Sequence, residues 1–309
     1  MNLKPSNQTN LFGHEKIFDE LYDLNKNDIL PNKILLSGEK GIGKSTLGYH
    51  IINSVLSKNE EYSYDFENYK INFENKTFKL IQNKSNPNFH LLDIENEKKN
   101  IDINQVRELI SNLNKSSFNN KKRFVLIDNI ELLNINSINA LLKLLEEPNK
   151  NINFILINNN KKILDTLKSR CLNFKVFFSF EKKIEIIDKI LNDHIYNLVN
   201  KEFIYHYITP GKLIEIIRTS KDLNIDIRNI SLRDYLLLVI NDKLYKKEKT
   251  VREIVYSFIE LYFRNNISIE NINLMDSYHY FLKKIHYTKI YNLDEEILFM
   301  EFKDRILNE

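Results

Sequence analysis

The chain has 309 residues, and its 45 lysines and arginines nearly balance 42 aspartates and glutamates, so the net charge of +3 predicts no strongly charged partner by itself. The single cysteine, Cys171, excludes an internal disulfide framework and a four-cysteine zinc site, and it fits a reducing compartment. The first residues lack the apolar core of a signal peptide, and no uncharged apolar run approaches about 18 residues. We therefore expect a soluble, cytoplasmic protein without a membrane segment.

The first helix is expected after Leu11-Phe12-Gly13-His14-Glu15, where Ile17, Leu21 and Leu24 recur at helical spacing. This lead-in either packs beside a nucleotide base or is an ordinary N-terminal helix.

A phosphate-binding loop follows. The apolar run at 33–37 predicts a buried strand and the stretch 47–56 a helix, which is the context that the pattern G-x-x-x-x-G-K-[S/T] needs. Glycines let the backbone wrap an anion, and N–H groups at the start of a helix point at phosphates. The candidate residues are Gly38, Gly41, Gly43, Lys44, Ser45 and Thr46, with Lys44 on the β- and γ-phosphate oxygens and Ser45 on Mg²⁺. The competing interpretation is a glycine-rich turn that binds nothing.

The segment 58–86 is polar and weakly periodic, and we expect strands at 69–73 and 78–81. Its composition indicates no function.

A second nucleotide signature lies further along, after a predicted strand at 88–94 and a helix at 103–113. The apolar run 124–127 predicts a central parallel strand, and Asp128 follows it at the sheet edge where ligands bind in open α/β folds. Asp128 either holds the Mg²⁺ of a nucleotide or caps a helix. Its position after a phosphate loop in the same domain favours the metal.

The next elements are a helix at 137–147 ended by Pro148, a strand at 153–157, a short helix at 164–168 and a strand at 172–176. Strands that alternate with helices predict an α/β fold with a parallel sheet. From about residue 178 only amphipathic helices are expected, at 181–191, 195–207, 211–219, 232–244, 250–263, 272–285 and 294–307. The predicted domains are a nucleotide-binding domain at 1–177, a helical lid at 178–222 and a helical bundle at 223–309. The apolar stripes of these helices form either a core or a partner-binding face.

Four stretches together resemble the clamp-loader branch of the AAA+ ATPases, most closely the delta-prime subunits of bacterial DNA polymerase III. They are Leu11-Phe12-Gly13-His14-Glu15, Gly41-Ile42-Gly43-Lys44, Asn139-Ala140-Leu141-Leu142-Lys143-Leu144-Leu145-Glu146-Glu147-Pro148 and Ser169-Arg170-Cys171. The fourth stretch follows the third by some twenty residues. This combination is a more specific signature than a phosphate loop alone. The resemblance covers residues 11 to about 220, and beyond that it is architectural, with helices where the family has its oligomerising collar.

The resemblance implies an AAA+ module that binds ATP and Mg²⁺. Lys44 and Ser45 would bind phosphate and metal, Asp128 would be the metal-associated acid, and Asn158 would sense the γ-phosphate. Arg170 matches the arginine that family members extend into a neighbouring subunit's nucleotide site, which would make it a catalytic group in trans. Lys212 is either a weak phosphate contact of a second sensor or a surface lysine.

Two departures qualify this assignment. Active family ATPases carry a glutamate after the metal-associated aspartate, whereas this chain has Asn129, whose amide can orient water but cannot accept its proton. Glu131 is expected to point elsewhere, so intrinsic hydrolysis should be slow or absent. The cysteine-rich zinc module of related subunits is also missing, and no zinc site is expected.

The preferred hypothesis is a delta-prime-like clamp-loader subunit, part of a complex with DNA-directed DNA polymerase activity. Its partners would be the tau/gamma and delta subunits in a hetero-pentamer, and through the complex the sliding clamp and primed DNA. One alternative is a self-sufficient tau/gamma-like AAA+ motor ATPase, and another is a small-molecule phosphotransferase, which leaves Ser169-Arg170-Cys171 unexplained. Direct DNA contact stays open, because lysine clusters such as 121–123 are more often solvated faces than phosphate clamps.

Overall fold

The computed structural model describes residues 4–94, 98, 100–115, 121–146, 151–267 and 272–308. The chain divides into two compact units, Met1–Ile186 and Ile187–Glu309. The finer division into three domains with boundaries after residues 177 and 222 stays a prediction.

The first unit contains a five-stranded sheet in which every pairing is parallel. The strands are β1 (Lys33–Ser37), β2 (Phe89–Leu92), β3 (Arg123–Ile127), β4 (Ile152–Asn158) and β5 (Leu172–Lys175), in the order β2-β3-β4-β1-β5. Strands β3 and β4 are buried along their whole length, as continuous apolar runs in a sheet covered on both faces should be. The parallel α/β fold predicted from the sequence is confirmed.

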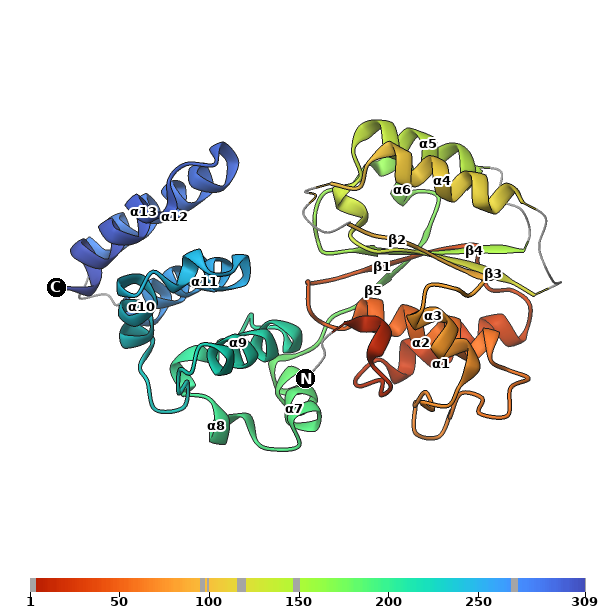
Figure 1. Cartoon of the computed structure of the whole chain (residues 1–309), viewed down its shortest axis with the longest axis horizontal. Coiled ribbons are helices and arrows are strands. Elements are labelled where there is room, and N and C mark those ends of the chain that lie inside the picture. The colour runs from red at the N-terminus through yellow and green to blue at the C-terminus, as the bar shows by residue number, and fades with distance from the viewer. Residues whose placement is uncertain are drawn as a thin grey trace. The chain divides into compact units, whose positions relative to one another are not determined.

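Helices cover both faces of this sheet (Figure 1). One face carries α1 (Glu15–Lys26), α2 (Lys44–Leu56) and α3 (Lys76–Gln82), and the other carries α4 (Ile103–Asn114), α5 (Ile135–Glu146) and α6 (Asp165–Lys168). Each layer has its own apolar core, with Phe124 of β3 in the first and Phe154 of β4 in the second. Two short 3₁₀ turns, Pro5–Asn7 and Ile130–Leu132, complete the described elements of this part.

The segment 58–86 differs from the prediction. Residues 78–81 lie in α3, because the Asn75 side chain accepts the backbone N–H of Phe78 and caps the helix. Residues 69–73 form no described strand, and Lys70 makes only isolated bridges to Asn10 and Asp65. Both expected strands are therefore wrong. Pro148, which was expected to end α5, lies outside the described residues.

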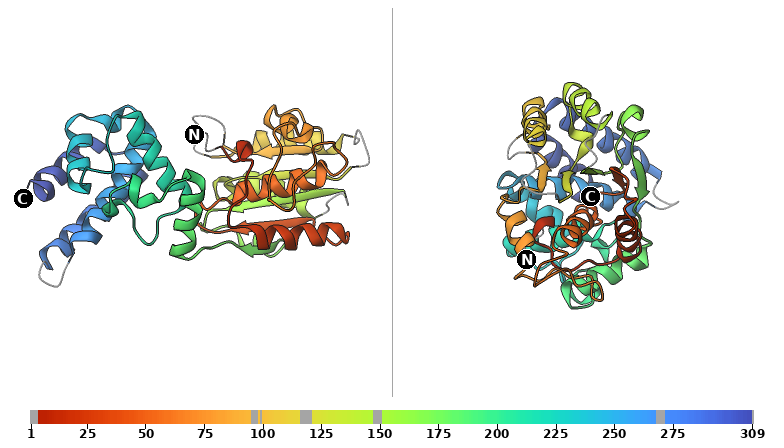
Figure 2. Two further views of the ribbon diagram at one scale, coloured as in Figure 1. Left: turned by 90° about the horizontal axis from the view of Figure 1, so that it is seen from below. Right: turned by 90° about the vertical axis from the view of Figure 1, so that its right-hand side faces the viewer.

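The described part of the second unit consists of helices and their connections (Figure 2). After α7 (Phe180–Leu191), which spans the division, these are α8 (Ile195–Leu198), α9 (Pro210–Asp222), α10 (Leu232–Asn241), α11 (Lys249–Asn266), α12 (Ile272–Tyr291) and α13 (Glu295–Phe302), with 3₁₀ turns at Lys201–Phe203 and Leu244–Lys246 and a π turn at Lys303–Leu307. The single helix expected at 195–207 is wrong: α8 ends at Leu198, and the Asn200 side chain then caps the 3₁₀ turn by accepting the Glu202 N–H.

The core of this second unit is aromatic. Phe203, Tyr235 and Phe258 meet with ring centroids 5.1–5.6 Å apart. Phe263, Phe281 and Phe302 form a second group at 5.3–5.9 Å. Most of the apolar stripe of α11 is therefore intramolecular core. No helix in the described ranges combines the length and apolar character needed to cross a bilayer.

Candidate nucleotide-binding site

The phosphate loop joins the end of β1 to the start of α2, as the sequence predicted. Gly41 and Gly43 have φ angles of +88° and +90°, which side-chain-bearing residues rarely adopt. A Cβ at Gly43 would also lie 2.9 Å from Nε2 of His14. The loop therefore needs glycine at both positions to turn its N–H groups toward an anion.

His14 braces this loop from the N-terminal segment. Its imidazole is buried, and its Nε2–H donates to the carbonyl oxygen of Ile42 at 2.7 Å. Burial lowers the pKa of His14 to about 4, so the ring is neutral at physiological pH.

Lys44 is almost completely buried at the start of α2, with 3% of its surface exposed. Its ammonium donates to the carbonyl oxygens of Gly38 and Glu39, at 2.9 and 2.6 Å, and to Oδ1 of Asn159 at 2.9 Å. Burial lowers its pKa from 10.5 to about 8, against the attraction of nearby carboxylates, of which Asp128 and Glu131 contribute most. Phosphate oxygens can replace these oxygen acceptors. The buried ammonium of Lys44 is therefore suited to bind a phosphate.

Ser45 and Asp128 meet across the sheet edge. The serine hydroxyl donates to Oδ2 of Asp128 at 2.6 Å, and burial raises the pKa of that carboxyl group although the hydrogen bond acts in the opposite direction. A hydroxyl and a carboxylate are oxygen ligands of the type that Mg²⁺ prefers beside nucleotide phosphates. The two residues predicted to hold the metal are thus brought together, and their donor set fits it.

Asn158 and Asn159 have different surroundings. Asn158, the last residue of β4, uses its side chain to hold the backbone N–H and C=O of Lys161, at 3.1 and 3.0 Å. The next residue, Asn159, contacts Lys44. The sequence singled out Asn158 and missed Asn159, because the register of neighbouring asparagines at a strand end decides which one faces the loop. The γ-phosphate role of Asn158 stays a prediction.

The surroundings of Asn129 correct one expectation. Nδ2 of Asn159 lies 2.9 Å from both Oδ1 of Asn129 and Oε1 of Glu131, and the backbone N–H of Asn159 points at Oε2 of Glu131 at 3.3 Å. Glu131 was expected to point elsewhere, and this is wrong. Asn129 has a φ of +56° and precedes a 3₁₀ turn. This turn directs the carboxylate of Glu131 back toward the phosphate loop.

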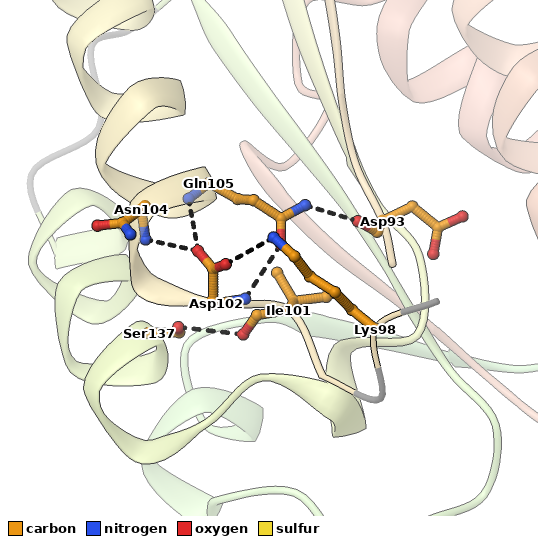
Figure 3. A network of polar contacts seen from close by, with 7 residues as sticks. All are labelled: Asp93, Lys98, Ile101, Asp102, Asn104, Gln105 and Ser137. Atoms are coloured by element: carbon orange, nitrogen blue, oxygen red, sulfur yellow. Dashed lines mark hydrogen bonds and ion pairs between the residues drawn. The ribbon is translucent and has the colours of Figure 1, made fainter. Parts of the chain in front are cut away.

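A second polar network connects the start of α4 to Asp93, which follows β2 (Figure 3). Asp102 and Gln105 form a capping box at the start of α4, and Gln105 Nε2 also donates to the carbonyl oxygen of Asp93 at 3.0 Å. Asp93 in turn accepts from Nδ2 of Asn129 at 2.9 Å. Asp93 thereby connects the N-terminus of α4 with the Asn129 side chain.

Arg170 lies away from this site. It follows α6 and precedes β5, and it is close to Glu146 at the end of α5, so both residues are at the amino edge of the sheet, opposite the phosphate loop. Its guanidinium donates to the carbonyl oxygen of Thr166 at 2.7 Å and to Oε1 of Glu146 at 2.8 Å, and 34% of the side chain is exposed. It therefore cannot serve its own chain's phosphate loop.

Thr46 and Lys212 are two further residues that the sequence predicted to contact the nucleotide. Thr46 lies half-buried in the first turn of α2. Lys212 belongs to the second unit, in the first turn of α9, where it pairs with Glu215 at 3.1 Å. Their nucleotide contacts stay predictions.

The parallel sheet, the glycine loop after β1 and the acid after β3 define a P-loop nucleotide-binding module. The family model described as "DNA polymerase III, delta subunit" matches residues 13–178, more than half of the chain, and the chain belongs to this family.

Individual relatives agree with this membership. The chain is 31% identical over 239 residues to the DNA polymerase III subunit gamma/tau of Mycoplasma genitalium, covering 76% of this chain and 35% of the relative. It is 32% identical over 139 residues to the subunit delta' of Pseudomonas aeruginosa, covering 45% of this chain and 40% of the relative. The matches thus span well under half of these relatives. Among solved structures, a DNA polymerase III gamma subunit-related protein of Thermotoga maritima is similar at 21% identity and a TM-score of 0.47, covering 92% of this chain and 97% of that one.

The delta-prime-like assignment is supported by the family model and by the delta' relative, and the self-sufficient motor is not favoured.

Proposed function

We propose that this chain is a delta-prime-like subunit of the clamp loader of the DNA polymerase III holoenzyme. It helps to place a sliding clamp on primed DNA, and it supplies Arg170 to the ATPase site of a neighbouring subunit. The observation that carries the proposal is the position of Arg170: it is partly exposed and on the edge of the sheet opposite its own phosphate loop. A guanidinium in that place has no phosphate of its own chain to serve, whereas at a subunit seam it neutralises charge on a transferring phosphoryl group.

The chain's own phosphate loop binds ATP with Mg²⁺ in this proposal. Lys44 holds phosphate oxygens, and Ser45 with Asp128 holds the metal, supported by the 2.6 Å contact between their side chains. Thr46, Asn158 and Lys212 add weaker nucleotide contacts. Hydrolysis at this site is slow, because Asn129 stands where active relatives have a glutamate.

The partners in this proposal are the tau/gamma and delta subunits of a hetero-pentamer in the cytoplasm, joined through the C-terminal helices at 223–309. The end of α12 supports such a contact because it exposes Tyr287, Ile290 and Tyr291, followed by Leu293 and Ile297, each 50–66% exposed. Apolar side chains gathered at one end of a helix are typical of a face that another protein covers.

The proposal is tested by reconstituting the complete clamp loader with this chain, with Arg170→Ala and with Lys168→Ala as a matched control from the same short helix. Arg170→Ala should assemble normally in size-exclusion chromatography and lower clamp loading and DNA-stimulated ATP turnover about 10³-fold or more, as loss of an arginine finger does. Lys168→Ala should behave as the unaltered chain. Clamp loading that proceeds equally well without this chain would refute the proposal.

A further inference from the structure

The carboxylate of Glu131 lies beside the phosphate loop although the sequence position does not suggest it. One side-chain amide, that of Asn159, donates to both Asn129 and Glu131 at 2.9 Å. Because both oxygens accept from the same nitrogen, the Glu131 carboxylate and the side chain of Asn129 are neighbours around one amide group. A carboxylate from two residues later thus lies next to the side chain of position 129, which is itself not acidic.

The surroundings of Glu131 favour action on a bound nucleotide. Oδ1 of Asn159 accepts from the ammonium of Lys44, so a single amide separates the Glu131 carboxylate from the group suited to bind the terminal phosphates. Asn159 supplies both donors to Glu131, one to each oxygen. An ionised carboxylate offers about four acceptor positions, so lone pairs remain for a water molecule.

We infer that Glu131 is a catalytic residue of this chain's own ATPase site, where it orients the attacking water and accepts its proton. The water oxygen bonds to the γ-phosphorus as the bond from that phosphorus to the β–γ bridging oxygen breaks, giving ADP and phosphate, and the proton leaves from the carboxylate to solvent. This inference rests on the nucleotide binding in the proposed function. The sequence alone predicts a site without a usable base. In this inference the site has a base, which stands two residues after the usual position.

The geometry also accounts for slow turnover. Asn159 engages Lys44 and Glu131 at once, so the carboxylate is held by an amide that must release Lys44 to the phosphates when a nucleotide binds. A base that needs rearrangement before each turnover gives a lower rate than one preorganised in place.

The test compares the full chain with Glu131→Gln, which has the same size and whose amide oxygen still accepts one of the two hydrogen bonds from Asn159. The matched control is Glu108→Gln, the same substitution at an exposed glutamate of α4. ATP affinity, measured by equilibrium binding with Mg²⁺, should stay within about threefold for both variants, because neither removes a phosphate ligand. The kcat of Glu131→Gln should fall about 10²-fold or more, as loss of a general base does, and that of Glu108→Gln should stay unchanged.

Each result has one meaning. Normal ATP binding with an unchanged kcat in Glu131→Gln refutes the catalytic role, and so does ATP binding without measurable hydrolysis by the unaltered chain. Absence of ATP binding refutes this inference and the nucleotide part of the proposed function together, but leaves the role of Arg170 intact. If Glu131→Gln lowers the melting temperature, Glu131→Asp provides the second test: a retained but shorter carboxylate should give an intermediate kcat.

Discussion

Replacing Lys44 with methionine should stabilise the free chain near neutral pH while abolishing nucleotide binding. Lys44 is buried, and its pKa is lowered from 10.5 to about 8 mainly by burial. A folded-state pKa below the unfolded value means that the unfolded chain binds more protons between the two, so folding stability rises with pH across that window. Below it, the buried charge destabilises the fold.

The shift gives the magnitude. A difference of roughly 2.5 pKa units corresponds to about 3 kcal/mol of destabilisation at neutral pH. Methionine removes that cost but leaves the acceptors of Gly38, Glu39 and Asn159 without their donor, a loss of about 0.5–1 kcal/mol each. The net gain for Lys44→Met near pH 7 is therefore about 1 kcal/mol. Its dependence on pH is larger: between about pH 7 and about pH 9.5 the unaltered chain should gain about 2 kcal/mol relative to the variant.

Urea unfolding of the unaltered chain and of Lys44→Met at these two pH values measures the difference between their free energies of unfolding. Titrations of other groups contribute equally to both chains and cancel. The acceptor losses also cancel, because they are the same at both pH values. A stability difference between Lys44→Met and the unaltered chain that does not change with pH would show that the ammonium is not destabilised by burial. Lys161→Met, at an exposed lysine, is the control and should show no such pH dependence.

Two further predictions concern the loop and the assembly face. Gly43→Ala should lower stability by about 1–2 kcal/mol and weaken ATP binding, because φ of +90° disfavours a side chain and the new Cβ would lie 2.9 Å from His14; unchanged urea unfolding would contradict this. Ile290→Asp should keep the melting temperature and abolish incorporation into the clamp loader in size-exclusion chromatography, since this exposed side chain touches water in the free chain. Lys283→Asp, an exposed charge reversal on the same helix, should still assemble.

The sheet could be predicted from the sequence because its central strands are unambiguous. The runs that became β1, β3 and β4 are apolar, short and bounded by polar residues, which is the pattern of strands buried on both faces. Their order along the chain, with helices between them, then leads to a parallel sheet. The phosphate loop and Asp128 follow from this frame, because both stand directly after such strands.

The segment around α3 could not be assigned in the same way. Phe78 and Ile81 are three residues apart, a spacing that fits one face of a helix, but the surrounding residues are polar and the helix has only seven residues. The side-chain cap at Asn75 decides in favour of the helix. A cap of this kind depends on a single asparagine. Because the sequence contains many asparagines, it does not indicate which of them caps a helix.

The missed site residues share one cause. Asn159 and Glu131 lie just after strands, in turns whose backbone direction the sequence pattern leaves open. For Glu131, the left-handed conformation of Asn129 reverses the chain into a 3₁₀ turn and redirects the side chain to the phosphate loop. Asparagine tolerates that conformation, but its presence does not require it.

The measurement that tests the central claim most directly is the DNA-stimulated ATPase rate of the complete clamp loader in which either Lys44 or Arg170 of this chain is replaced. The account predicts that a complex with Lys44→Met keeps most of its rate, because its own slow site contributes little, whereas a complex with Arg170→Ala loses about 10³-fold or more. The opposite pattern, a rate that depends on Lys44 and not on Arg170, would show that this chain works as a motor for itself and would contradict the account.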